Sequence, residues 1–228
     1  MQIETFVEET RRDLASVLER RGKILYSAAR TLSPGKLYFL GLNPGGTDSS
    51  VTISSHLASL PTRVENAYEE EWDSTRTHYA AGAAPLQRRI KYLFEDILGC
   101  PLTDVCATNL IFMQTHDAGE LRFQQDAATC WPVHQRMLGI IQPKVIVAFG
   151  NSGLSPYAFL RQQLSSSPDE VIPSGHGTWK CRSFDGVMND NQVTVVGLPH
   201  MSRYSPVKRE GVAEWLREKA GLTQAELA

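Results

Sequence analysis

Long apolar runs are missing from this chain of 228 residues. No run approaches the ~20 consecutive apolar residues that a membrane-spanning helix needs. The first residues, Met-Gln-Ile-Glu-Thr, include an acidic residue and lack the apolar stretch of a signal peptide. We therefore expect a cytoplasmic protein with no membrane partner.

An excess of charge of either sign is also missing. Lys and Arg number 23 and Asp and Glu number 25, which leaves a formal net charge of -2. A chain without a global basic field does not attract polyanions as a whole. Any nucleic-acid site in this protein must therefore be a local patch.

Cysteine is scarce and does not occur as CxxC pairs. The chain has four cysteines, Cys100, Cys106, Cys130 and Cys181. In a reducing compartment this pattern favours free thiols in the core, with a metal or cluster site as the weaker interpretation. We expect no metal and no cofactor.

Several motifs that identify common enzyme classes are absent. There is no GxSxG nucleophile elbow, no GxGxxG after the first expected strand, and no GxxxxGK[ST] loop. Their absence argues against an α/β-hydrolase, a dinucleotide-binding enzyme and a P-loop enzyme. The six histidines show neither HExxH nor another metal-ligand spacing.

Apolar runs alternate with segments of helical periodicity, which predicts a mainly parallel sheet in a three-layer α/β/α sandwich. We expect one domain over residues 1–228, with a helical segment at 1–33 and a core at 36–222. The expected strands are 37–42, 104–112, 145–149 and 192–198. The expected helices are 3–21, 85–98, 131–141, 156–164 and 205–221. We expect a loop over 45–62, a short helix over 63–73, and an excursion over 165–190 with a hairpin around 178–184.

Each expected strand ends in polar or glycine-rich residues. The first ends in Asn43-Pro44-Gly45-Gly46, the second in Asn109, the third in Gly150-Asn151 and the fourth in Pro199-His200. In such sheets, sites form beyond the carboxyl ends of the strands. An Asn offers an acceptor beside a donor, which matches the edge of a pyrimidine such as uracil. A neutral His can donate a hydrogen bond to a developing anion.

Four segments in this order resemble motifs of the uracil-DNA glycosylase superfamily, closest to its Asn-type branches, the mismatch-specific and single-strand-selective enzymes. They are GLNPGG (41–46), ATNLIF (107–112), PKVIVAFGNSG (143–153) and GLPHMSRYS (197–205). The resemblance implies excision of uracil or a related deaminated base from DNA by a monofunctional glycosylase. It also implies that the target nucleotide is rotated out of the stack.

The resemblance assigns catalytic roles to two residues. Asn43 would position the attacking water, and His200 would stabilise the leaving base. The residues expected to bind the base are Gly41, Leu42, Pro44, Gly45, Asn109 and Phe112. The aromatic that stacks on the base is unassigned, with Phe112, Tyr79 and Trp72 as candidates.

The implied partner is DNA, without an obligate protein partner, and a bacterial enzyme of this kind would be associated with the nucleoid. Met201 or Tyr204 would wedge into the gap left by the flipped base. The expected DNA contacts are Gly46, Asn151, Ser152, Met201, Ser202, Arg203, Tyr204 and Lys208. Met201 stands where the superfamily usually has Pro.

Other interpretations remain open. The chain is alternatively a non-catalytic or differently specific nucleobase- or nucleotide-binding protein of the same fold. A lower-ranked alternative is a hydrolase or transferase acting on small nucleotides, for which Asp48 is the nearest acid. His176 is expected in a loop that could reach the mouth of the pocket. The cluster Arg88, Arg89 and Lys91 is expected to be a solvated face, with phosphate contact as the minority interpretation.

Overall fold

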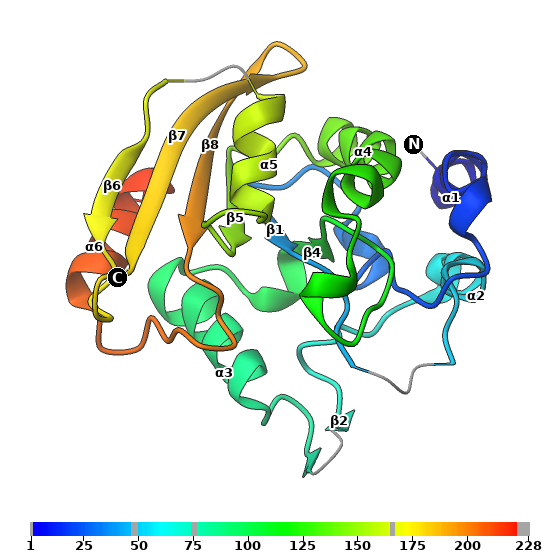
Figure 1. Cartoon of the computed structure of the whole chain (residues 1–228), viewed down its shortest axis with the longest axis horizontal. Coiled ribbons are helices and arrows are strands. Elements are labelled where there is room, and N and C mark those ends of the chain that lie inside the picture. Colours follow the sequence, from blue (N-terminus) through cyan, green and yellow to red (C-terminus); the bar gives the residue numbers. More distant parts are fainter. Residues whose placement is uncertain (1, 47–49, 74–76, 165–166, 223–228) are drawn as a thin grey trace.

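The computed structural model describes residues 2–46, 50–73, 77–164 and 167–222. Its centre is a six-stranded sheet in the order β4-β1-β5-β8-β7-β6 (Figure 1). The bounds are β1 Leu37–Gly41, β4 Cys106–Asn109, β5 Val145–Phe149, β6 Glu170–Pro173, β7 Lys180–Met188 and β8 Asn191–Leu198. The first four strands in the sheet order are parallel, and β7 and β6 extend the sheet in antiparallel fashion. A separate pair joins β2 (Trp72–Asp73) to β3 (His78–Tyr79).

Helices cover both faces of the sheet, which confirms the three-layer α/β/α sandwich (Figure 1). One face carries α1 (Ile3–Asp13), α2 (Ile53–Ser59), α4 (Phe123–Ile141) and α5 (Pro156–Gln163). The other carries α3 (Pro85–Lys91), which continues as a π-helical segment over Tyr92–Ile97, and α6 (Glu210–Lys219). Short 3-10 turns lie at Ala15–Val17, Ala29–Thr31, Leu60–Thr62, Leu102–Asp104 and Ala118–Glu120.

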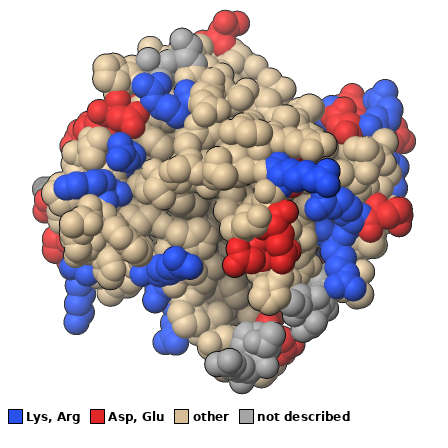
Figure 2. All heavy atoms as spheres, in the orientation of Figure 1, with Lys and Arg blue, Asp and Glu red and all other residues tan. Residues whose placement is uncertain are grey.

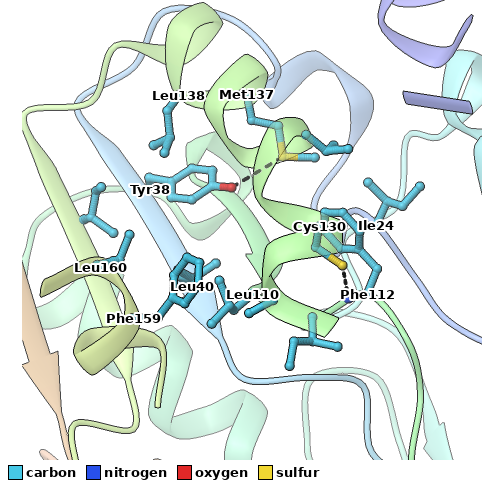
Figure 3. Close-up of a cluster of buried hydrophobic side chains, with 14 of the residues drawn as sticks. Ile24, Tyr38, Leu40, Leu110, Phe112, Cys130, Met137, Leu138, Phe159 and Leu160 are labelled. Atoms are coloured by element: carbon cyan, nitrogen blue, oxygen red, sulfur yellow. Dashed lines mark hydrogen bonds between the residues drawn. The ribbon is translucent and has the colours of Figure 1, made fainter. Parts of the chain in front are cut away.

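The buried strands divide their side chains between the two layers of helices. In β1, Tyr38 and Leu40 belong to one core and Leu37 and Phe39 to the other, because successive side chains of a strand point to opposite faces. Figure 3 shows Tyr38 and Leu40 among residues of α4 and α5. Burial on both faces explains why these strands read as continuous apolar runs.

Several element boundaries differ from the sequence-based expectation. The expected loop over 45–62 contains α2, which Thr52 and Ser55 begin with a reciprocal capping box. The expected helix over 63–73 is wrong, because that segment forms turns and β2. Helix α4 begins at Phe123 rather than at residue 131.

The ends of α1, β4 and α6 also lie elsewhere. Helix α1 ends at Asp13 rather than at residue 21, and β4 covers only Cys106–Asn109 of the expected strand over 104–112. Helix α6 begins at Glu210, after a turn in which the Ser205 hydroxyl accepts a hydrogen bond from the Val207 amide.

The excursion over 165–190 forms two hairpins. The turn between β6 and β7 lies at 174–179, so the expected hairpin at 178–184 was centred a few residues too late. The turn between β7 and β8 contains Asn189 and Asp190, both with positive φ.

The cysteines are free thiols: Cys106, Cys130 and Cys181 are buried and Cys100 is partly buried. Burial raises the pKa of each of the three buried thiols to about 12. Across the described residues, no helix is long and apolar enough to cross a membrane.

Candidate functional site at the carboxyl edge of the sheet

The strand order places the candidate site. Across the sheet the four parallel strands lie in the order β4-β1-β5-β8. From β1 the chain goes to β4 on one side and then to β5 on the other, so the direction of winding reverses between β1 and β5. Ligands of open α/β sheets bind beyond the carboxyl ends of the strands at such a reversal. Here β1 leads to Asn43 and β5 leads to Gly150, while Asn109 ends the neighbouring β4 and His200 follows the neighbouring β8.

Gly41 lies at the centre of this edge. It pairs with Asn109 in the register between β1 and β4. A Cβ atom at residue 41 would overlap the Oδ1 atom of Asn109 and would lie 2.6 Å from Cζ of Phe149. The Phe149 ring in turn makes an edge contact with His200, with ring centroids 5.2 Å apart. The carboxamide of Asn109 and the Phe149 ring therefore both lie against Gly41, and the imidazole of His200 lies beside the Phe149 ring.

Tyr26 and His134 hold the end of β4. The side chain of Asn109 lies near the Tyr26 hydroxyl and lowers its pKa, but burial has the larger effect and raises the pKa of Tyr26 well above its ordinary value. His134 Nε2 lies 2.9 Å from the Leu110 carbonyl and therefore donates to it, so Nδ1 accepts from the Tyr38 hydroxyl at 2.8 Å. Burial lowers the pKa of His134 to about 4, which keeps its ring neutral. These contacts fix both the strand end and the amide of Asn109.

The hydrogen bonds of His200 define its tautomer. The backbone N–H of Ser202 donates to Nδ1 at 3.3 Å, and the Ser202 hydroxyl lies 2.7 Å from the same nitrogen. Because an N–H can only donate, Nδ1 is the acceptor and the neutral ring carries its proton on Nε2. Burial and the nearby charge of Arg203 lower the pKa of His200, which favours this neutral form. His200 thus presents one N–H donor beside Phe149.

Arg89 anchors the loop that carries His200. Its Nη1 atom donates to the carbonyl oxygens of Met201 at 2.7 Å and of Ser202 at 2.8 Å. The expectation of a solvated face is therefore wrong for Arg89, although Arg88 is exposed. A bond from a charged donor is worth about 1.5–3 kcal/mol, so this contact fixes the loop firmly.

Asn43 lies in a turn tied to the segment after β4. Its Nδ2 atom donates to Thr115 Oγ1 at 2.8 Å and to the Pro44 carbonyl at 2.9 Å. Gln114 Nε2 donates to the carbonyl oxygens of Gly45 and Gly46. With both amide hydrogens engaged, the Oδ1 atom of Asn43 is the part of this side chain left to bind a water molecule.

Three expected contact residues lie in the interior. Phe112 is fully buried and packs on His134 with ring centroids 4.9 Å apart, so it is a core residue rather than the stacking partner of a base. Met201 and Tyr204 are also fully buried, and the Tyr204 hydroxyl donates to the Ser174 carbonyl. The expected wedge needs correcting, because the His200 loop folds inward and uses both side chains for packing.

The other expected residues lie around the same edge. Leu42 is partly buried against the core, Pro44 is buried, and Gly45, Gly46, Ser152, Ser202, Arg203 and Lys208 are exposed. The Asn151 amide donates to the carbonyl oxygens of Lys180 and Gly197, so it links the sheet to the turn after β5. Asp48 lies outside the described residues.

Sequence reasoning missed Phe149, Tyr26 and Arg89. Phe149 could have been predicted, because it is the last residue of the expected strand over 145–149, and the carboxyl end of that strand was already a candidate position for the site. Tyr26 lies between α1 and β1, in a stretch without helical or strand periodicity. Arg89 shares a helix with other basic residues, and nothing in the local pattern distinguishes it from a solvated neighbour.

Hollows elsewhere on the molecule include one at the opposite edge of the sheet. It measures about 100 Å³ and lies where β5 and β8 begin, lined by Leu138, Gly139, Gln142, Pro143, Met188, Asn189, Asn191 and Val193. Its lining has no titratable side chain. It is a rival location for a small ligand, although the catalytic candidates lie at the other edge.

No model of a protein family matches this chain, and a search of curated proteins finds none similar to it.

Proposed function

We propose that this protein is a DNA glycosylase that hydrolyses the N-glycosidic bond of uracil or a related deaminated pyrimidine. The observation that carries the proposal is the chain of contacts at the strand-order reversal, in which Asn109 and Phe149 lie against Gly41 and His200 lies against Phe149. An amide supplies an acceptor and a donor, an aromatic ring supplies a flat apolar surface, and an imidazole supplies one further donor. This set complements a pyrimidine ring with two carbonyls and one N–H.

The reaction that we propose uses the hydrogen-bond acceptor on Asn43 and the hydrogen-bond donor on His200. The Oδ1 atom of Asn43 accepts a hydrogen bond from a water molecule, whose oxygen bonds to C1′ of the deoxyribose and whose lost proton passes through solvent to the departing base. The bond between C1′ and N1 breaks, and its electron pair leaves with the base as an anion. The Nε2–H of His200 donates to a ring oxygen of that anion. Removing such a donor typically costs about 3–4 kcal/mol of transition-state stabilisation.

Asn109 supplies the base specificity in this account. Its Oδ1 accepts from the N3–H of uracil and its Nδ2 donates to O4. Cytosine presents an acceptor at N3 and a donor at N4, so the same amide would place acceptor against acceptor and donor against donor. The buried aromatic surroundings of Gly41 strengthen this discrimination, since unpaired polar groups are costly in such a site. A protein of this function acts on DNA in the cytoplasm, at the nucleoid in a bacterial cell.

Oligonucleotides labelled at one end and carrying uracil, thymine mismatches, hypoxanthine or xanthine test the proposal. Incubation with the protein followed by alkali cleaves the strand wherever a base has been removed. We expect cleavage at uracil, and its loss in Asn43→Ala and His200→Ala, whereas Gly211→Ala in α6 retains it. Absence of cleavage at every base, with the wild-type chain folded, would overturn the enzymatic proposal.

One observation favours a second candidate, a protein that binds the base without cutting it. Asn43 carries no carboxylate that could take a proton from water, and its amide is already bonded to Thr115 and Pro44. A binder of this kind would retain uracil-containing DNA with no alkali-sensitive product. Asn109→Ala would then abolish retention, whereas Asn43→Ala would leave it unchanged.

A further inference from the structure

The loop that joins β6 to β7 lies at the same edge as the candidate site. It covers residues 174–179, and we call it the 174–179 loop. Strand β7 is antiparallel to β8, so β7 begins where β8 ends. Asn151 in the turn after β5 bonds the Lys180 carbonyl, and Tyr204 in the His200 loop bonds the Ser174 carbonyl. The 174–179 loop therefore lies beside the candidate site.

This loop presents an aromatic pair to solvent. Trp179 is 38% exposed, and its ring lies 4.6 Å from that of His176, with the planes tilted by 50°. The Trp179 amide donates to the His176 carbonyl, and the Ser174 amide donates to the Trp179 carbonyl. The backbone thus holds the two rings together as a small platform. Nothing in the excision chemistry uses either ring.

The two chain segments at this edge contain basic residues and no acidic ones. The segments 174–181 and 199–209 contain Lys180, Arg203, Lys208 and Arg209, and neither contains Asp or Glu. Within the described part of the chain, none of the ion pairs includes these four cations. Figure 2 shows Lys and Arg side chains along the lower left of its face, where Figure 1 places the segment between β8 and α6.

Arg209 links the basic group to the loop. Its side chain lies against Gly175: a Cβ atom at residue 175 would stand 3.0 Å from Cδ and 3.3 Å from Nη1 of Arg209. Gly175 has a φ of +72°, which also favours glycine. The Nε atom of Arg209 is buried with no hydrogen-bond acceptor among the described residues. The guanidinium charge is therefore held beside the platform with no carboxylate to neutralise it.

We propose that the His176–Trp179 platform stacks on an unpaired base next to the flipped nucleotide, while the four cations contact the phosphates of the same strand. Aromatic side chains interleaved with unpaired cations are the combination that binds single-stranded nucleic acid. The proposal rests on the proposed function for its choice of DNA as the partner. It adds a preference for single-stranded or locally opened DNA, and it assigns that preference to a loop outside the excision machinery.

Binding of a fluorescent oligothymidylate tests this assignment, because that strand has no base to excise. Stacking contributes ~1–3 kcal/mol per base, so Trp179→Ala should weaken binding about 5- to 150-fold. Trp179→Phe should retain much of the affinity, and Val187→Ala, an exposed apolar residue at the far end of β7, should match the wild type. Lys180→Gln should reduce the steepness of the plot of log K against log salt concentration by roughly 0.7, because one phosphate contact is lost.

Two controls separate this proposal from the excision chemistry. A blunt duplex without uracil and the base-free polyanion heparin should bind Trp179→Ala as they bind the wild type. Unchanged oligothymidylate affinity in Trp179→Ala, or equal losses for oligothymidylate and heparin, would overturn the proposal. Excision can fail while this result stands, and excision can succeed while this result fails, so the two proposals are judged independently.

Discussion

The Oδ1 atom of Asn109 occupies the space that a Cβ atom of residue 41 would need. The two residues are partners in the register between β1 and β4, and Phe149 fills the remaining space beside them. Glycine at 41 is therefore a requirement of this site rather than of the turn that follows. The positions of the candidate base-reading amide and of the Phe149 ring both depend on that missing side chain.

Replacing Gly41 tests this dependence. Gly41→Ala forces Asn109 and Phe149 to move, which should cost about 1–3 kcal/mol of stability through overpacking. A displacement of about 1 Å at a reacting site costs about 100-fold in rate, so uracil excision should fall by at least that factor. Gly211→Ala in α6 is the matched control, because its Cβ would meet no atom within 4 Å. Chemical denaturation and single-turnover excision measure the two effects, and a fully active Gly41→Ala would refute the crowding argument.

Removing the Tyr26 hydroxyl tests how the amide of Asn109 is oriented. Tyr26→Phe removes the hydroxyl that lies near the Asn109 side chain and keeps the ring. A neutral hydrogen bond contributes about 0.5–1.5 kcal/mol, so excision should slow about 2- to 12-fold. Discrimination between uracil and cytosine should fall as well, since the amide can then rotate. Tyr92→Phe serves as the control, because Tyr92 belongs to the π-helical segment that continues α3 and not to the strand ends. Equal rates for both variants would show that Tyr26 has no role in positioning.

Variants of the neighbouring residues Arg88 and Arg89 should differ in activity, because Arg89 contacts the loop that carries His200. Arg89→Gln removes a charged donor to the Met201 and Ser202 carbonyls and should loosen the loop. A hydrogen bond from a charged donor contributes about 1.5–3 kcal/mol, so the single-turnover rate should fall about 10- to 150-fold. Arg88→Gln changes an exposed side chain one residue away and should leave the rate unchanged. If Arg88→Gln and Arg89→Gln lowered the rate equally, general loss of positive charge would explain both.

The lowered pKa of His200 predicts how the excision rate depends on pH. Its pKa lies below the ordinary 6.5 because of burial and Arg203, so the ring is neutral at pH 7 and gains a proton only in more acidic solution. Protonation places a hydrogen on Nδ1 and ends its acceptance from the Ser202 N–H. At saturating enzyme, the excision rate should be level above pH 6.5 and should fall below it.

Arg203→Gln should move that fall to higher pH, since it removes a charge that lowers the pKa of His200. Lys208→Gln removes a charge that does not act on His200 and should leave the profile in place. Saturating enzyme removes the loss of DNA affinity that both variants share. A profile that is identical in wild type and Arg203→Gln would contradict the assignment of the acid limb to His200.

The strand ends could be predicted from the sequence because parallel buried strands are short apolar runs with abrupt polar ends. Asn43, Asn109 and His200 follow directly from that pattern, and β5 was predicted at its observed bounds. Helix α2 was missed because its Ser and Thr residues read as loop, whereas Thr52 and Ser55 form a cap. Local composition does not reveal a reciprocal cap of this kind unless its spacing is tested.

The tertiary contacts that complete the site leave little trace in the sequence. Met201 and Tyr204 look like wedge residues because they follow His200, yet the loop turns inward and buries both. Tyr26 reaches Asn109 from a segment 83 positions earlier in the chain, and Arg89 reaches Met201 from 112 positions earlier. Contacts over such separations depend on how the layers pack, which the local pattern does not encode.

The most direct measurement is a crystal structure with an oligonucleotide that carries 2′-fluoro-2′-deoxyuridine, whose glycosidic bond resists hydrolysis. The account predicts a flipped uracil beyond the ends of β1 and β5, with its N3–H and O4 bonded to Asn109, its ring against Phe149, and O2 facing Nε2 of His200. A base that stays stacked in the DNA, or that binds in the hollow lined by Leu138 and Val193 at the opposite edge, would contradict it.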